Sequence, residues 1–268
     1  AEARGRDLRL LQSDPVTGLD PAELAAALNE QVALVCLSHV NYRSAAIAPL
    51  AEITRLVHDA GALVLWDLCH SAGVLPVELD AGDVDMAAGC TYKYLNGGPG
   101  SPAFCYVATR LQEELRQPVW GWMGASDPFA MAADYRPAEG IRKFISGTPP
   151  VLAMQPLKDM LELIAEAGLA AVRRKSVALT EHAIALADER LAPLGAVLGS
   201  PRAAADRGSH VTVDHPRFAE VTAALWKSGV IPDFRTPDGI RIGLSPLSTS
   251  FAELDRGVEA IARELRDQ

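Results

Sequence analysis

Two apolar segments of strand length, separated by a helical pattern, restrict the possible folds of this chain most. The segments cover residues 32–37 and 62–66, and neither contains a charged residue. Continuous apolar runs of this length are typical of strands buried on both faces of a sheet. Between them, Leu50, Ile53 and Val57 recur at the spacing of a helix. A strand, a helix and a strand in this order predict a right-handed crossover and a parallel sheet.

The neighbouring sequence extends this α/β pattern. Asp20 precedes a proline and is followed three residues later by a glutamate, which predicts the start of a helix that continues through residues 21–28. A short strand is expected at residues 85–90, and its hairpin partner at residues 103–107 follows a glycine-rich turn. We therefore expect residues 1–150 to form a large α/β domain.

The second half of the chain has a different pattern. Residues 151–190 have the apolar spacing of helices, with Gly168 as a break, and we interpret them as connecting helices. Residues 191–268 alternate short strands and helices, which predicts a smaller α+β domain. Its last helix begins with Ser250 and Glu253 as a capping box. The other elements expected there are a strand at residues 211–213, a helix over 216–228, a strand at 240–244, and Leu254, Val258, Ile261 and Leu265 on the buried face of the last helix.

Charge and cysteine content limit the class of protein. The net charge of −9 argues against a surface for nucleic acid or anionic membranes. No apolar stretch approaches the roughly 18 residues of a membrane span, and the first seven residues lack the apolar core of a signal peptide. We therefore expect a cytoplasmic protein that acts on a small molecule. Four cysteines lie in or beside apolar runs without metal-site spacing, so we expect buried, reduced thiols and no metal: Cys36, Cys69, Cys90 and Cys105.

Two polar residues follow strands of the predicted parallel sheet. Asp67 ends the second apolar run, and Lys93 follows the third strand between Tyr92 and Tyr94. Ligands of open α/β sheets bind at the carboxyl ends of the strands, so Asp67 and Lys93 should lie at one edge. A pyridoxal enzyme needs an amine for a Schiff base and a carboxylate that keeps the pyridine nitrogen protonated. Each residue alone is more often an ordinary loop residue, but the glycine-rich turn at residues 97–100 favours a ligand site.

Six blocks of sequence carry a more specific pattern. They are residues 39–44 (HVNYRS), 67–73 (DLCHSAG), 89–100 (GCTYKYLNGGPG), 121–124 (GWMG), 140–150 (GIRKFISGTPP) and 240–246 (IRIGLSP). In this order, the blocks resemble the kynureninases, a family of pyridoxal 5'-phosphate enzymes with the fold type I architecture of aspartate aminotransferase. The resemblance implies hydrolysis of L-kynurenine, or its 3-hydroxy form, to an anthranilate and L-alanine in tryptophan catabolism.

The resemblance also implies roles for four residues near the cofactor. Lys93 would form the Schiff base and then move protons on the substrate. Tyr92 would hydrogen-bond the cofactor phosphate and would be the proton donor when the β-carbon is released. Asp67 would pair with the pyridinium nitrogen. His70 would orient Asp67, although a structural histidine is the plainer interpretation of that residue.

Further residues would bind the phosphate or the substrate. Trp122 and Thr148 match positions that reach the phosphate from the neighbouring subunit, which implies a homodimer, although their residue types alone would suggest a core and a turn position. Arg241 would bind the substrate α-carboxylate through its planar guanidinium. Ser38 is either a cofactor contact or a cap at the end of its strand. Weaker candidates for carboxylate binding are Arg43 and Arg142.

Some features leave alternatives open. A kynureninase is expected to carry a further segment ahead of these blocks, with a phosphate-binding loop and an aromatic residue that stacks on the cofactor ring. A noncatalytic fragment is therefore one alternative. The other is a different fold type I enzyme, a cysteine desulfurase or a class V aminotransferase, but those usually have histidine where this chain has Tyr92. Ala45 stands where the family has glycine.

Overall fold

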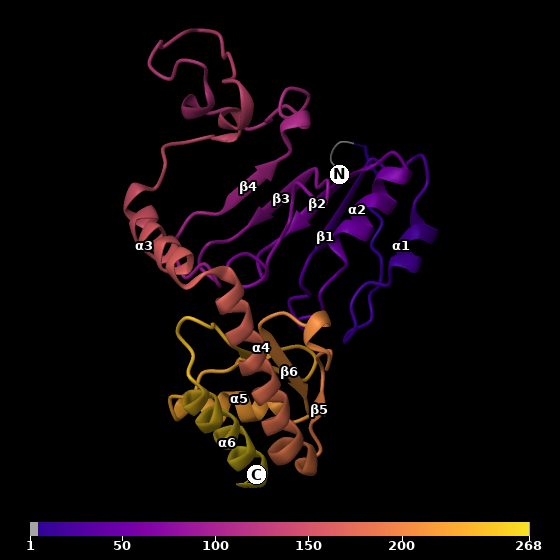
Figure 1. Ribbon diagram of the computed structural model, residues 1–268, viewed down its shortest axis with the longest axis vertical. Coiled ribbons are helices and arrows are strands. Elements are labelled where there is room, and N and C mark those ends of the chain that lie inside the picture. The colour runs from indigo at the N-terminus through magenta and orange to yellow at the C-terminus, as the bar shows by residue number, and fades with distance from the viewer. Residues whose placement is uncertain (1–4, 268) are drawn as a thin grey trace.

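The structure is a computed structural model that describes residues 5–267, and it contains two separate sheets (Figure 1). The first sheet consists of β1 (Leu34–Ser38), β2 (Leu63–Asp67), β3 (Met86–Gly89) and β4 (Phe104–Val107), in that order. β1 and β2 are parallel, as are β2 and β3, whereas β3 and β4 are antiparallel. The predicted parallel sheet and its hairpin partner are confirmed.

Helices cover one face of the first sheet. α1 (Pro21–Ala27) begins after Asp20, whose carboxylate accepts a hydrogen bond from the Ala22 N–H at 2.8 Å, as the capping pattern predicts. α2 (Leu50–Asp59) connects β1 to β2 and lies beside the sheet (Figure 1). The buried cluster between these helices and the strands includes Leu24, Val35, Ile53, Val57, Val64, Trp66 and Ala87.

The other face of the first sheet is open, which corrects two expectations. In β1, Val35 is buried under the helices, but Leu34 is 50% exposed and Cys36 is exposed. The prediction of a strand buried on both faces is therefore wrong for β1. Neighbouring residues of a strand point to opposite faces, and an apolar run does not reveal whether both faces are covered. The prediction of four buried thiols is also wrong: Cys36 and Cys105 are exposed on the open face, Cys69 is half-buried and Cys90 is buried.

Two long helices follow the first sheet. α3 (Val151–Ala167) and α4 (Leu169–Leu186) meet at Gly168, whose φ of 76° is readily adopted by glycine. The predicted break is confirmed. The apolar stripe of α3 is partly covered: Ile164 is buried, Leu157 and Met160 are half-buried, and Leu161 is 44% exposed. Across residues 5–267, no helix is both long and apolar enough to cross a membrane.

The second sheet is antiparallel. Its strands are β5 (Val197–Leu198), β6 (His210–Asp214), β8 (Gly239–Gly243) and β7 (Asp233–Arg235), in that order. Figure 1 shows α4 and the two later helices packed around it. These two helices are α5 (Phe218–Lys227) and α6 (Phe251–Asp267).

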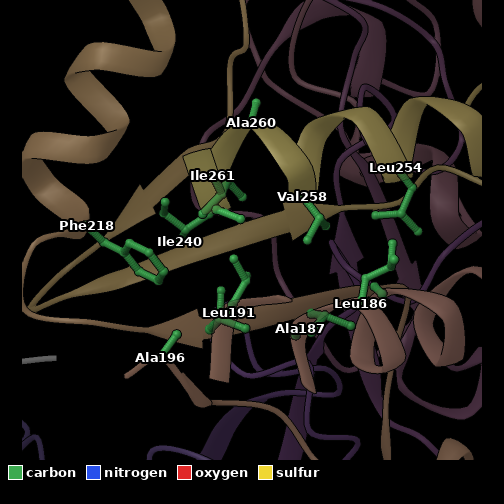
Figure 2. Close-up of a cluster of buried hydrophobic side chains, with 14 of the residues drawn as sticks. Leu186, Ala187, Leu191, Ala196, Phe218, Ile240, Leu254, Val258, Ala260 and Ile261 are labelled. Atoms are coloured by element: carbon green, nitrogen blue, oxygen red, sulfur yellow. The ribbon is translucent and has the colours of Figure 1, made fainter. Parts of the chain in front are cut away.

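The core of this second unit lies between the sheet and its helices. In Figure 2, Ile240 of β8 faces Val258 and Ile261 of α6. The predicted capping box precedes α6: the Ser250 N–H donates to Glu253 Oε2 at 2.8 Å, and the Glu253 N–H donates to Ser250 Oγ at 3.2 Å. All four residues expected on the buried face of α6 are buried, namely Leu254, Val258, Ile261 and Leu265.

The segment after β1 attaches the two sheets to each other. The Arg43 guanidinium pairs with Asp214 of β6 at 2.7 Å, and the Thr212 hydroxyl donates to the Arg43 carbonyl. Nearby, Ala45 has a φ of 67°, and its carbonyl accepts the Gly208 N–H at 2.8 Å. Glycine adopts this left-handed conformation without steric cost, which explains why it is expected at this position. Arg43 is therefore engaged in joining the sheets.

Candidate functional site

Asp67 and Ser38 lie side by side at the carboxyl ends of their parallel strands. They are register partners in the β1–β2 pair, and the Ser38 hydroxyl donates to Asp67 Oδ2 at 3.1 Å. The Cys69 N–H donates to Asp67 Oδ1 at 2.8 Å. Burial raises the pKa of Asp67, but hydrogen bonds from Cys69 and Ser38, together with His70, outweigh this effect and lower the pKa below its ordinary value. Asp67 is therefore an anion at this edge of the sheet.

A glycine allows the loop that carries Lys93 to pack against the loop that follows Asp67. A Cβ on Gly73 would lie 2.7 Å from the Tyr94 carbonyl oxygen, so no other residue permits this close contact without movement of the backbone. Tyr94 is buried, and its hydroxyl donates to the Ser209 carbonyl at 3.0 Å. The loops that carry Asp67 and Lys93 therefore lie side by side, as predicted, and contact each other through the backbone of Gly73 and Tyr94.

Lys93 and Tyr92 lie close to each other at the surface of this loop. The Lys93 Nζ is 5.7 Å from the centroid of the Tyr92 ring, within the range of a cation–π contact. The Tyr92 side chain is 53% exposed. Its neighbour Cys90 raises the pKa of Tyr92 above the ordinary value, so the phenol keeps its proton at neutral pH. Tyr92 can therefore donate a proton to a ligand.

His70 lies between the Asp67 end of the site and the second sheet. Burial, followed by the positive charges of Lys93 and Arg241, lowers the pKa of His70 to about 4, so the imidazole is neutral at neutral pH. Its Nε2 lies 3.3 Å from Arg241 Nη1. A guanidinium only donates hydrogen bonds, so Nε2 must be the acceptor and the ring proton belongs on Nδ1.

His210 belongs to this cluster but was not among the predicted site residues. Its ring centroid lies 5.4 Å from that of His70, and the side chain is 1% exposed. Within the described residues, neither ring nitrogen has a partner in good hydrogen-bonding geometry, although the Arg43 backbone lies close enough to raise the pKa of the ring. Burial lowers the pKa of His210 well below its ordinary value. A sequence signal was present, since His210, Thr212 and Asp214 alternate with valines and give β6 one polar face.

Arg241 reaches the same cluster from β8. Its Nη1 donates to the Tyr42 carbonyl at 2.6 Å, and its Nη2 pairs with the Asp233 carboxylate. The side chain is 14% exposed. The structure thus places the predicted carboxylate-binding arginine beside His70, but with its guanidinium already engaged by groups of the protein.

Trp122 and Thr148 lie on a segment that follows β4. This segment leaves the first sheet at the end of the strands opposite to Asp67. β4 ends at Val107, which pairs with Met86 at the start of β3, and Figure 1 shows the following segment extending beyond that end. Trp122 is 44% exposed and Thr148 is exposed. In the described part of the chain, no hydrogen bond or ring contact joins either residue to Asp67 or Lys93. Arg142 lies on the same segment and donates to the Ala125 carbonyl at 2.9 Å.

Buried histidines predict how stability depends on pH. The pKa values of His39 and His70 are each lowered to about 4, against about 6.5 in an unfolded chain. Between these values the unfolded state binds protons that the folded state does not, so stability falls as the pH decreases from about 6.5 to about 4. We expect a loss of a few kcal/mol, measured by urea unfolding. His70→Gln should reduce this slope, and an equal slope in His70→Gln and the unaltered protein would contradict the assignment.

Comparisons with known proteins show which proteins this chain is similar to. The family described as "Kynureninase C-terminal domain" matches residues 172–261. The kynureninase of Burkholderia mallei is 43% identical over 264 residues, which cover 98% of this chain and 62% of that protein. The kynureninase of Pseudomonas fluorescens is 42% identical over 262 residues, which cover 98% of this chain and 61% of that protein. The chain is thus similar to kynureninases along nearly its whole length, and residues 172–261 match the C-terminal domain of that family. The chain spans less than two thirds of the length of these kynureninases.

Solved structures confirm the expected fold. The cysteine desulfurase of Thermococcus onnurineus has a TM-score of 0.81 at 19% identity, covering 97% of this chain and 66% of its own. A C-DES mutant with glycine covalently linked to its PLP cofactor has a TM-score of 0.78 at 20% identity, covering 92% and 64%. Alanine–glyoxylate aminotransferase from Nostoc has a TM-score of 0.66 at 24% identity, covering 93% and 65%. At these identities the similarity shows the fold type I architecture alone. The sequence relatives, at 42–43% identity, are kynureninases and not desulfurases or aminotransferases.

Proposed function

We propose that the protein is a kynureninase, which hydrolyses L-kynurenine or 3-hydroxykynurenine to the corresponding anthranilate and L-alanine with pyridoxal 5'-phosphate. The observation that carries this proposal is the meeting of the Asp67 and Lys93 loops through Gly73 at the carboxyl edge of a parallel sheet. The 43% identity to a kynureninase over 98% of the chain supports the same activity.

The residues at this edge fit the cofactor. When bound, pyridoxal phosphate supplies an electron-withdrawing ring that stabilises negative charge on the substrate. Asp67 has the lowered pKa needed to remain an anion opposite a protonated pyridine nitrogen. Ser38 and the Cys69 N–H hold its two carboxylate oxygens in place. Lys93 would supply the amine that attaches the cofactor.

Other residues of the cluster would act on the substrate. Lys93 would move the proton at the substrate α-carbon. Tyr92, which is half-exposed and protonated, would donate a proton to the β-carbon when the carbon–carbon bond breaks. Neutral His70 would keep its unprotonated Nε2 toward Arg241, whose guanidinium would bind the α-carboxylate.

We also propose a homodimer in which Trp122 and Thr148 complete the phosphate site of the partner subunit. Its support is the exposed position of both residues on a projecting segment with uncovered apolar side chains. These side chains are Trp120, Phe129 and Met131, at 67%, 74% and 83% exposed. A surface of this kind is typical of a protein interface. The two sheets also support our division into a large domain (1–150), connecting helices (151–190) and a small domain (191–268).

A cytoplasmic location is part of the same proposal. All four cysteines are free, which is typical of proteins in a reducing compartment. The net charge of −9 favours a small-molecule enzyme over a protein that binds nucleic acid or anionic membranes. A role in tryptophan catabolism, which the resemblance to kynureninases implies, is consistent with the free cysteines and with the net charge.

The central experiment mixes the purified protein with pyridoxal phosphate, records the visible absorption of the lysine-bound cofactor, and then adds L-kynurenine. We expect a cofactor band and the fluorescence of anthranilate. Absence of the band would contradict cofactor binding by this protein. A band with alanine released from cysteine, or with transamination of another amino acid, but without anthranilate, would favour a desulfurase or an aminotransferase.

The role of Arg241 predicts a change in substrate binding. Arg241→Ala removes the charge that pairs with the α-carboxylate, so KM for L-kynurenine should rise about 10- to 100-fold, as expected for a lost charge-assisted hydrogen bond. The cofactor band should remain, and kcat should change much less than KM. The exposed Arg55→Ala in α2 is the control. An unchanged KM in Arg241→Ala would show that another group binds the carboxylate.

A further inference from the structure

Asp233 is shared by two arginines at the edge of the second sheet. Its Oδ2 pairs with Nη2 of Arg241 and lies 2.7 Å from Nη2 of Arg235. Asp233 and Arg241 are register partners in the antiparallel β7–β8 pair, which holds the two side chains opposite each other. The carboxylate is 41% exposed, whereas the Arg241 side chain is only 14% exposed. The ion pair therefore shields the arginine from solvent.

Both terminal nitrogens of Arg241 have acceptors within the protein. Nη1 donates to the Tyr42 carbonyl at 2.6 Å and lies 3.3 Å from His70 Nε2, while Nη2 is held by Asp233. A ligand carboxylate that binds through the two terminal nitrogens thus meets an anion already in place. Of the three acceptors, only Asp233 has the charge and chemistry of that ligand.

Asp233 has a second partner when it leaves Arg241. This partner is Arg235. Its guanidinium lies 5.9 Å from the centroid of the Tyr42 ring, and this cation–π contact holds Arg235 in place. Asp233 can therefore keep one ion pair while it releases the other. The Asp233 carboxylate is 41% exposed, so a small carboxylate in solution can approach the ion pair.

We propose that Asp233 is an internal carboxylate that occupies Arg241 until the carboxylate of a ligand replaces it. The exchange sets the affinity for carboxylate ligands, because each must displace an existing ion pair, whereas a ligand without a carboxylate cannot take the place of Asp233. Asp233 is thus a residue that determines specificity. This inference rests on the proposed role of Arg241 as the carboxylate-binding residue.

The test uses chemical labelling of arginine, which requires neither cofactor nor turnover. The purified protein is treated with phenylglyoxal, and the rate at Arg241 is measured by mass spectrometry. Asp233→Asn, which keeps the shape but removes the charge, should label Arg241 about fivefold faster, the effect of a lost ion pair of ~1 kcal/mol. Asp233→Glu should retain protection. The rate at Arg43, which pairs with Asp214, is the internal reference.

Competition with acetate completes the experiment. Acetate should protect Arg241 in Asp233→Asn at about fivefold lower concentration than in the unaltered protein, since no internal anion has to leave. Equal protecting concentrations, or equal labelling rates, would overturn the inference. In turnover, Asp233→Asn should lower KM for L-kynurenine, and a raised KM would show that Asp233 positions Arg241 instead. Failure of the unaltered protein to cleave kynurenine would reject the proposed function, while the acetate result would still decide the role of Asp233.

Discussion

Lys93→Ala should abolish the visible band of bound cofactor and lower the turnover of L-kynurenine at least about 10³-fold, because in the function proposed above one side chain supplies both the covalent attachment and the proton transfer. No second lysine lies in the Asp67 and Lys93 loops to replace it. The loop itself should keep its shape, since it is held by Tyr94 and by the Asn96 N–H, which donates to the Lys93 carbonyl at 2.9 Å. Absorption spectra and anthranilate fluorescence measure the two effects.

The control for this substitution is Lys158→Ala. Lys158 is 69% exposed on α3 and pairs with Glu162 of the same helix, so its loss should leave the band and the turnover unchanged. Circular dichroism of both variants checks the fold. A full cofactor band in Lys93→Ala would show that a different amine holds the cofactor.

The second large effect is expected from Asp67→Asn. The amide keeps the size of the carboxylate but removes the charge that we propose faces the pyridine nitrogen. The Ser38 hydroxyl and the Cys69 N–H, which lower the pKa of Asp67, would then lack a negative acceptor. We expect kcat to fall by about 10²- to 10³-fold, the range for losing one preorganised electrostatic contact at a reacting centre. Stopped assays of anthranilate formation at saturating kynurenine measure this change.

A surface carboxylate is the matched control for Asp67. Asp59 ends α2, pairs with Arg55 at 2.6 Å and is 61% exposed, so Asp59→Asn should leave kcat unchanged. In Asp67→Asn, the cofactor should still attach through Lys93, but with altered absorption because the ring nitrogen has lost its anionic partner. Unaltered kcat and absorption would exclude Asp67 as that partner.

Local sequence patterns predicted the elements of this structure well. The Asp20 cap, the Gly168 break and the Ser250–Glu253 capping box each depend on residues within one turn of a helix, and all three are present. The parallel pairing of β1 with β2 followed from the strand, helix, strand alternation, because a crossover helix joins parallel strands. Asp67 was placed correctly at a strand end for the same reason.

Properties that depend on a covering layer were not predictable in the same way. Cys36 lies in a fully apolar run, yet it is exposed, because the helices of this chain pack on the other face of the sheet. His210 was not predicted as a site residue, because its burial against His70 depends on the packing of the two units. Burial of a strand residue depends on which face another element covers.

The sequence by itself determined the resemblance to kynureninases, the fold class and the residue types that the proposed chemistry needs, since periodicity, spacing and motif order are properties of the chain. Only the tertiary structure decided how these residues are engaged. Arg241 meets His70 across 171 residues of sequence, and it is held by Asp233. Gly73 brings the two site loops together through contact with the Tyr94 backbone. Such contacts depend on how the two sheets and their loops are placed in space, and no local pattern of residues encodes that placement.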